Sequence, residues 1–339
     1  MKKLFCISAA ILLMASGCTK ENSTKESKTA QLSISPSLRQ LNTKALIDNS
    51  NITSQMIRVQ VAKEADGSAS YLSGDAKYTL SYDAGNTRWV LSDKLYLTQD
   101  FAKIYAYAPC PADPATVETG SYSSLVMSLD VPAAPNMAAQ IDYLYCNQGA
   151  TAQGGPIKIN SANSAVNLTL DHALTQVAFV FYKENFSGDG ELSSVKIKDN
   201  SGSNAFRVNK SSDNDLAMSV ADGLITGGDA TAEVGVTNVG KTISLDTPPP
   251  GDVDELKAMI DAYILLVPTV AIDNKTDVQF IFNIDTKDYT VTLSGADGIN
   301  WIKGMQYIYT VKMRGSELTI EGVSVTPWTS QYEGEVVIN

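Results

Sequence analysis

Histidine and cysteine are scarce in this 339-residue chain, and their scarcity excludes several kinds of active site. The single histidine, His172, is accompanied by neither a G-x-S-x-G element nor a nucleophilic cysteine. Triad hydrolysis therefore has no candidate, and His172 is interpreted as a structural residue at a strand turn. No CxxC pair and no glycine-rich phosphate loop occurs. The sequence predicts no enzyme, no metal site and no cofactor.

A long apolar run is also lacking. The run Leu4–Met14 is about half the length that a membrane-spanning helix needs. It follows two lysines and ends in small residues, which is the layout of a secretory signal. Because Ala15-Ser16-Gly17-Cys18 resembles a bacterial lipobox, residues 1–17 are predicted to be a lipoprotein signal peptide, cleaved between Gly17 and Cys18, with lipid on Cys18. An ordinary signal peptide with an incidental cysteine is the alternative. Residues 18–29 form a polar tether.

Basic residues are too few for a nucleic-acid-binding protein. There are 26 of them against 37 acidic residues, and the formal charge of −11 becomes −13 once Lys2 and Lys3 leave with the signal. So acidic a chain is not expected to bind nucleic acid, and anionic lipid would repel it. Attachment to a membrane would then require acyl chains.

Alternation of apolar and polar residues dominates the remainder, with Gly, Asn, Asp and Pro between the alternating runs. This period of two predicts many short strands and hence antiparallel β-sandwiches. The length leaves room for two domains, an N-terminal sandwich over 30–160 and a C-terminal one over 161–339, divided within Asn147–Ala165. The clearest runs contain Ala30, Leu32 and Ile34; Ile57, Val59 and Val61; Phe280, Phe282 and Ile284; and Tyr307, Tyr309, Val311 and Met313.

Two segments depart from simple alternation. Val177–Tyr182 is apolar on both faces, which predicts a central strand with Val177, Phe179 and Phe181 in the second core. Val253–Ala262 has helical spacing and is the one helix candidate.

Carboxylates in two polar stretches are interpreted as solvated acids rather than a glycosidase pair, namely Asp213 and Asp215, and Asp252, Asp254 and Glu255.

Cysteines and tryptophans receive structural interpretations. Cys110 and Cys146 lie in neighbouring strand-like runs, and the sequence leaves open whether they form a disulfide or remain two buried thiols. The tryptophans occur in strand-like contexts and are interpreted as core residues rather than as an exposed platform for a ligand: Trp89, Trp301 and Trp328.

The two ends of the chain carry the most distinctive strands. Ala30–Leu38 alternates but contains Pro36, which lacks a ladder donor and predicts an edge or terminal strand. Near the other end the apolar phase switches at Glu321-Gly322, which predicts a β-bulge. A last apolar run, Val336–Ile338, follows. A strand at either end can leave its sheet without displacing other elements.

Seven features in order resemble the fimbrillin family, the subunits of type V pili and related surface lipoproteins. They are the lipobox and the segments NTKAL, IYAYAP, IDYLYC, LTLDHALTQVAFVF, AYILLVP and LTIEGVSVTPW. The resemblance implies two transthyretin-like sandwiches in tandem. It also implies export to the cell surface and assembly by strand exchange after proteolysis removes the first strand. The position matching the family's cleavage site is Lys44, which would leave Ala45 as the new N-terminus, and Arg39 lies upstream.

These features lead to one leading function and one alternative. The leading function is a structural subunit of a cell-surface fimbria that supports adhesion. Its donor strand would lie within 318–338, and its partners would be other pilin subunits, an outer-membrane lipid anchor and a host or bacterial surface ligand. The alternative is a monomeric surface lipoprotein that binds a glycan or another ligand.

Overall fold

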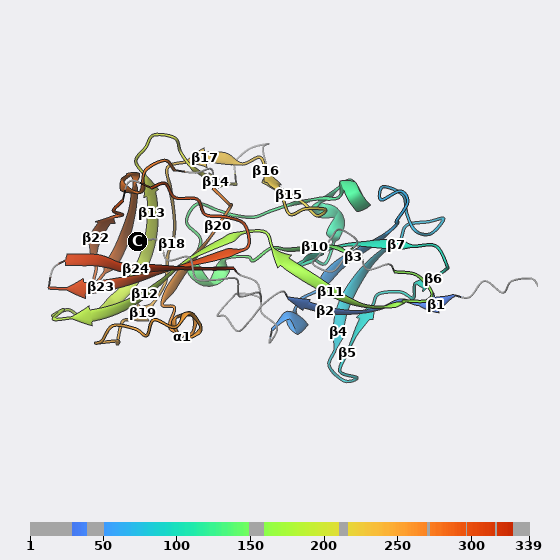
Figure 1. Cartoon of the computed structure of the whole chain (residues 1–339), viewed down its shortest axis with the longest axis horizontal. Coiled ribbons are helices and arrows are strands. Elements are labelled where there is room, and N and C mark those ends of the chain that lie inside the picture. The colour runs from blue at the N-terminus through green and yellow to red at the C-terminus, as the bar shows by residue number, and fades with distance from the viewer. Residues whose placement is uncertain are drawn as a thin grey trace, which may run out of the picture.

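The computed structural model describes residues 29–38, 51–148, 159–209, 216–269, 272–295, 297–315 and 317–327. In these ranges the regular secondary structure is almost entirely β-strand, which confirms the predicted all-β class. Two groups of sheets lie one after the other along the long axis of the molecule (Figure 1). The transthyretin-like topology implied by the resemblance stays a prediction.

The first group is a seven-stranded sheet that curls until its two ends meet. Its two end strands, β2 and β5, contact each other, and the short β1–β6 pair extends this contact. In spatial order the strands are β2 (Ser33–Leu38), β11 (Ala165–His172), β10 (Leu144–Gln148), β7 (Ala102–Ala108), β3 (Ile57–Lys63), β4 (Lys77–Asp83) and β5 (Arg88–Leu91), with β1 (Ala30–Gln31) and β6 (Tyr96–Leu97) beside them.

The second group is a pair of sheets that face each other across an aromatic core. One sheet is β20 (Ala262–Leu266), β12 (Thr175–Glu184), β23 (Met305–Arg314) and β24 (Glu317–Pro327). The other is β18 (Glu233–Val236), β13 (Glu191–Asp199), β21 (Val278–Ile284) and β22 (Lys287–Thr292), with β19 (Lys241–Thr242) on β13. Most ladders are antiparallel; β2–β11 and β12–β23 are parallel.

Residues of β12 confirm the prediction for the second core. Val177, Phe179 and Phe181 are almost completely buried in its main hydrophobic cluster. The Phe179 ring meets the rings of Phe280 and Phe282 edge-on, with centroids 5.0 and 5.2 Å apart. The opposite face of β12 is also covered, because Ala178 and Val180 pack in a separate cluster beneath the one α-helix of the described ranges. β12 is therefore a central strand buried on both faces.

The α-helix occurs where the sequence predicts it but is shorter. α1 spans Val253–Ala258, whereas the prediction continued to Ala262, which instead begins β20. The carboxylate of Asp252 caps the helix by accepting from the backbone N–H groups of Asp254 and Glu255. These acidic residues thus form a helix cap and first turn. Five short 3-10 helices complete this inventory of the described chain: Ile52–Ser54, Pro114–Thr116, Tyr122–Ser124, Met137–Ala139 and Lys275–Asp277.

The chain passes from the first group of sheets to the second at Ala173–Leu174, between β11 and β12. β11 therefore belongs to the first sheet, although it follows the division predicted at residue 160; that division stays a prediction as a domain boundary. A four-stranded sheet bridges the two groups by pairing segments from both sides of the division. It consists of β16 (Ile225–Thr226), β15 (Ala217–Ser219), β9 (Val126–Ser128) and β8 (Glu118–Thr119), and a separate pair joins β14 (Phe206–Val208) to β17 (Asp229–Thr231).

Candidate assembly surfaces

β2 closes the first core from the edge of its sheet. It pairs in parallel with β11, with Ile34 opposite Val166 and Leu38 opposite Leu170. Leu32, Ile34 and Leu38 point into the core and are each no more than 4% exposed. On its far side the backbone N–H of Leu32 donates to Leu95 O over 2.8 Å. β2 thus fills a gap between β11 and the 95–97 segment, which we call the β2 groove.

The proline of β2 is placed where its missing donor costs nothing. Ser33 N donates toward β11, to Ser164 O over 2.9 Å. Because backbone direction alternates along a strand, the nitrogen of Pro36 faces away from β11. This confirms the prediction of an edge strand. Burying three aliphatic side chains in the β2 groove contributes roughly 5 to 9 kcal/mol before ordering costs.

β24 is an edge strand of the second group of sheets, in the half of the molecule that does not contain the β2 groove (Figure 1). Among the described strands it pairs only with β23, and the register shifts so that Thr310 faces Gly322 while Val311 faces Ile320. Glu321 is the extra residue, which confirms the predicted bulge. The bulge lets side chains from both phases pack on the second core, although all four remain half-buried: Leu318, Ile320, Val323 and Val325.

Charged side chains of β12, β23 and β24 form ion pairs on the solvent-exposed side of this sheet edge. Lys312 Nζ lies 2.8 Å from Glu321 Oε1 on β24 and 3.6 Å from Glu184 Oε2 on β12. The hydrogen bond with Glu321 raises the pKa of Lys312 above its ordinary value. Ion pairs in contact with water add little stability, because solvent and salt screen the charges. They therefore leave β24 held mainly by its ladder to β23 and by half-buried apolar contacts.

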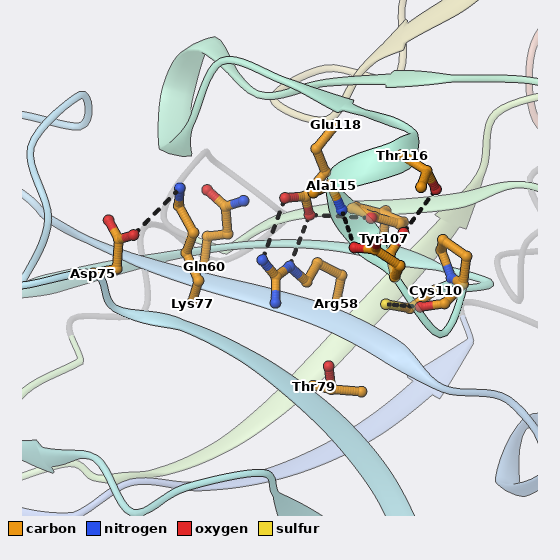
Figure 2. Close-up of polar contacts among 12 residues, drawn as sticks. Arg58, Gln60, Asp75, Lys77, Thr79, Tyr107, Cys110, Ala115, Thr116 and Glu118 are labelled. Atoms are coloured by element: carbon orange, nitrogen blue, oxygen red, sulfur yellow. Dashed lines mark hydrogen bonds and ion pairs between the residues drawn. The ribbon is translucent and has the colours of Figure 1, made fainter.

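A polar cluster on the outer face of the first sheet was missed by sequence reasoning. Figure 2 shows Arg58 of β3 reaching Glu118 of β8, with Tyr107 of β7 beside them. Arg58 donates to both carboxylate oxygens over 2.7 and 3.3 Å, and Tyr107 Oη donates to Oε1 over 3.0 Å. Burial raises the pKa of Tyr107, and the charge of Glu118 raises it further. Both oxygens of the Glu118 carboxylate accept hydrogen bonds, so the cluster holds β8 of the bridging sheet against the first sheet.

The cysteines and the histidine have structural surroundings. Cys110 and Cys146 are buried and are not joined by a disulfide. Cys146 lies opposite Ala106 and packs in the first core, while Cys110 is four residues further along and belongs to the cluster under the bridging sheet. The two side chains thus pack in different hydrophobic clusters. The two-thiol alternative is the one observed, and burial raises the pKa of the Cys110 thiol.

His172 ends β11 at the strand turn, as predicted, and both it and Asp142 are buried. Its Nδ1 lies 2.9 Å from Asp142 Oδ1. Both side chains are almost completely withdrawn from solvent, so the pair is interpreted as a structural contact between β11 and the segment before β10. Within the described ranges, histidine, cysteine, aspartate and glutamate side chains nowhere gather in threes as a metal site requires.

The tryptophans that the structure describes do not form a ligand platform. Trp301 is completely buried, although it lies outside a strand, and Trp89 is half-buried against the first core. In the same ranges no helix is both long and apolar enough to cross a membrane. The remaining candidate residues lie outside the described residues: Gly17, Cys18, Arg39, Lys44, Ala45, Asp213, Asp215, Trp328 and Val336–Ile338.

Solved structures share this fold. A candidate cell adhesion protein from Bacteroides uniformis matches with a TM-score of 0.56 at 14% identity, covering 89% of this chain and 98% of its own. A candidate cell adhesion protein from Bacteroides ovatus gives 0.55 at 14% identity, with 89% and 99% covered. A fimbrial protein from Bacteroides vulgatus gives 0.54 at 14% identity, with 88% and 99% covered. At this identity the likeness establishes the fold alone.

Comparison with curated proteins finds no match. A family model is more informative. The model described as fimbrillin-like matches residues 43–328, which is most of the sequence and includes both groups of sheets. The chain belongs to the fimbrillin-like family.

Proposed function

We propose that the protein is a non-enzymatic structural subunit of a bacterial cell-surface fimbria that supports adhesion. It is exported as a lipoprotein anchored through Cys18 in the outer membrane. Proteolysis after Lys44, or after Arg39, removes the lipid together with β2. The β2 groove then accepts a strand from within 318–338 of another subunit. Membership of the fimbrillin-like family supports the fimbrial role, and the finer steps are argued from the strands themselves.

The position of β2 is the observation that carries the proposal. β2 is the first long strand of the described chain, it lies at a sheet edge, and its buried side chains seal the first core. Arg39 and Lys44 follow it in the sequence, so one cut beyond β2 detaches both the anchor and the strand. The opened groove would expose unpaired backbone groups and apolar side chains, which an added strand satisfies.

The direction of growth follows from where donor and acceptor lie. β24 lies in one half of the molecule and the β2 groove lies in the other (Figure 1). A contact between two different surfaces of identical subunits is head-to-tail, and it produces an open filament when the rotation between successive subunits does not close a ring.

N-terminal sequencing of filaments sheared from cells tests the proposal. Filament subunits are expected to begin at Ala45, and Lys44→Gln should prevent that cut, whereas Lys63→Gln, at an exposed lysine of β3, should not. Electron microscopy of the purified, protease-treated protein should show filaments. Filaments whose subunits still begin at Cys18 would contradict the proposal, and protease-treated protein that stays monomeric would favour the ligand-binding alternative.

A further inference from the structure

β24 contains a close copy of the β2 sequence. Leu32–Pro36 reads LSISP and Val323–Pro327 reads VSVTP. Of the twelve prolines in the chain, only Pro36 and Pro327 end a pattern of aliphatic, Ser, aliphatic, Ser or Thr, and Pro. We infer that Val323–Pro327 of one copy replaces Leu32–Pro36 of the next in one register, with Val325 at the site of Ile34 and Pro327 at the site of Pro36. This inference rests on the proposed strand exchange.

The facing of the side chains fits this replacement. Leu32, just before β2, and Ile34 within it are buried, while Ser33 and Ser35 are exposed. In β24, Val323 and Val325 both pack on the second core, so the two valines already share one face of the donor strand. A segment with this pattern can move between the two positions without changing which of its faces is apolar.

Burial favours the groove over the position in the chain's own sheet. Val323 and Val325 are only half-buried in β24. The sites they would enter hold Leu32 and Ile34, each 3% exposed. Apolar surface that is still in contact with water in β24 would therefore be removed from water in the groove. Each valine is smaller than the residue it replaces, so the copy fits without overpacking.

The proline fixes the register. A slip by one residue would direct both valines to solvent and turn the nitrogen of Pro327 toward β11, where a ladder donor is needed. A slip by two residues leaves both valines pointing into the groove, but it places Pro327 at a fully buried aliphatic site, that of Ile34 or of Leu38. Only the proposed register places proline on proline, at a site that is half-buried in β2.

Cysteine pairs on the outer face of the groove distinguish the registers. Ala165 lies opposite Ser33, and Asn167 lies opposite Ser35, all of them exposed. In the proposed register Ser324 of the incoming strand takes the place of Ser33. The double variant Ala165→Cys/Ser324→Cys should therefore give disulfide-linked ladders when sheared filaments are oxidised. The variant Asn167→Cys/Ser324→Cys should not, because a two-residue offset separates the Cα atoms by about 8 Å.

Each outcome is informative. Ladders through Ala165→Cys alone support the inference. Filaments that link only through Asn167→Cys, or through neither, would overturn the register while leaving strand exchange intact. Cells that make no filaments, with wild-type protein included, would overturn both the inference and the proposed function.

A second pair of variants tests, without cysteines, which side chains of the incoming strand point into the groove. Val325→Asp would place a carboxylate in the closed apolar groove, whereas Ser324→Asp adds the same charge one residue away on the outer face. Val325→Asp should slow addition of the strand to protease-treated acceptor by at least about tenfold, and Ser324→Asp should change it by less than about threefold. Equal effects would overturn the inference. Circular dichroism on both variants establishes that the subunit itself remains folded.

Discussion

Single side chains hold the bridging sheet to the first sheet. The ion pair of Arg58 and Glu118 is mostly withdrawn from solvent, with side chains 14% and 9% exposed, and Tyr107 completes its hydrogen bonding. A charge in such a place depends on its partner, because removing one member leaves the other buried and uncompensated. An exposed pair such as Lys196 and Glu233, 46% and 41% exposed, has water as an alternative partner.

The first prediction compares these two pairs. Arg58→Ala should lower the free energy of unfolding by about 3 kcal/mol because Glu118 loses its charged partner in a place that water hardly reaches. Lys196→Ala should lower it by less than about 1 kcal/mol. Urea denaturation measures both. Equal losses would show that the Arg58 pair behaves as an ordinary surface pair.

Asp199 supports a prediction about pH. It is buried and accepts hydrogen bonds from Ser201 N, Ser203 Oγ and Ala205 N over 2.8 to 3.1 Å. Burial alone would raise the pKa of Asp199, but the hydrogen bonds outweigh it and the pKa lies below its ordinary value of 3.8. Since the folded state lowers this pKa, the carboxylate contributes stability above about pH 4 and loses it as the pH falls through the folded value.

Asp199→Asn should therefore cost about 1 to 3 kcal/mol of unfolding free energy at pH 7, because a carboxylate that accepts from three donors is lost. The difference from wild type should shrink below pH 4. Unfolding curves from pH 7 to pH 3 measure it, with the exposed Asp273→Asn as a control. A difference that stays constant across this range would contradict the assignment of the effect to the charge.

Whether a side-chain contact can be predicted from the sequence depends on how far apart its residues lie along the chain. The buried ring of Phe179 is predictable because its neighbours in the same strand repeat the apolar pattern. The contacts Arg58–Glu118 and Asp142–His172 join residues 60 and 30 positions apart. No local period marks such pairs, since each depends on which strands become neighbours in the sheets.

Strands and their edges are the elements the sequence predicts best. The alternating runs, the proline in β2 and the phase switch in β24 are all local patterns, and each corresponds to an observed feature. The C-terminal end of α1, by contrast, is not determined by a local sequence pattern. Residues 259–262 keep apolar spacing, but Ala262 is drawn into the β12–β20 ladder, where it lies opposite Phe179. Tertiary pairing thus ends the helix before its own pattern does.

The central strand β12 supports a prediction at this scale. Phe179→Ala should reduce the free energy of unfolding by about 3 to 5 kcal/mol, because it removes a ring packed edge-on against two others and leaves a cavity. Thr290→Ala, at an exposed position of β22, should change it by no more than about 0.5 kcal/mol. Thermal unfolding measures both variants. An unchanged melting temperature for Phe179→Ala would mean that the ring does not pack as the structure shows.

At the scale of the whole molecule, the two groups of sheets are joined by more than the β11–β12 connection. Segments from each side cross to the other: Leu129 N donates to Leu216 O, and Gly235 N donates to Ala133 O. A shared hydrophobic cluster lies beneath these crossings and contains residues of both groups, including Tyr107 and Leu265. A subunit that must carry tension along a filament would gain from such a joint, because its halves cannot separate without breaking both ladders and core.

Gln140 lies at the centre of this joint. Its side chain is buried, accepts from Leu265 N over 2.7 Å and donates to Tyr263 O over 3.1 Å, so it links the chain before β10 to β20. Gln140→Ala would leave a buried donor and a buried acceptor unsatisfied, at a cost of about 1 to 3 kcal/mol each. Gln279→Ala is a fitting control, because its hydrogen bond to Thr292 stays within the β21–β22 hairpin.

The joint predicts that the two groups of sheets unfold together. Calorimetry of the wild-type protein should show one transition, with the calorimetric and van't Hoff enthalpies in agreement. Gln140→Ala should lower the melting temperature and broaden or divide the transition, since weaker coupling lets one group unfold before the other. Gln279→Ala should leave a single transition at nearly the wild-type temperature. Two separate transitions in the wild type, unchanged by Gln140→Ala, would show that the segments crossing between the two groups of sheets do not couple their unfolding. A filament of this subunit could then bend within each repeat.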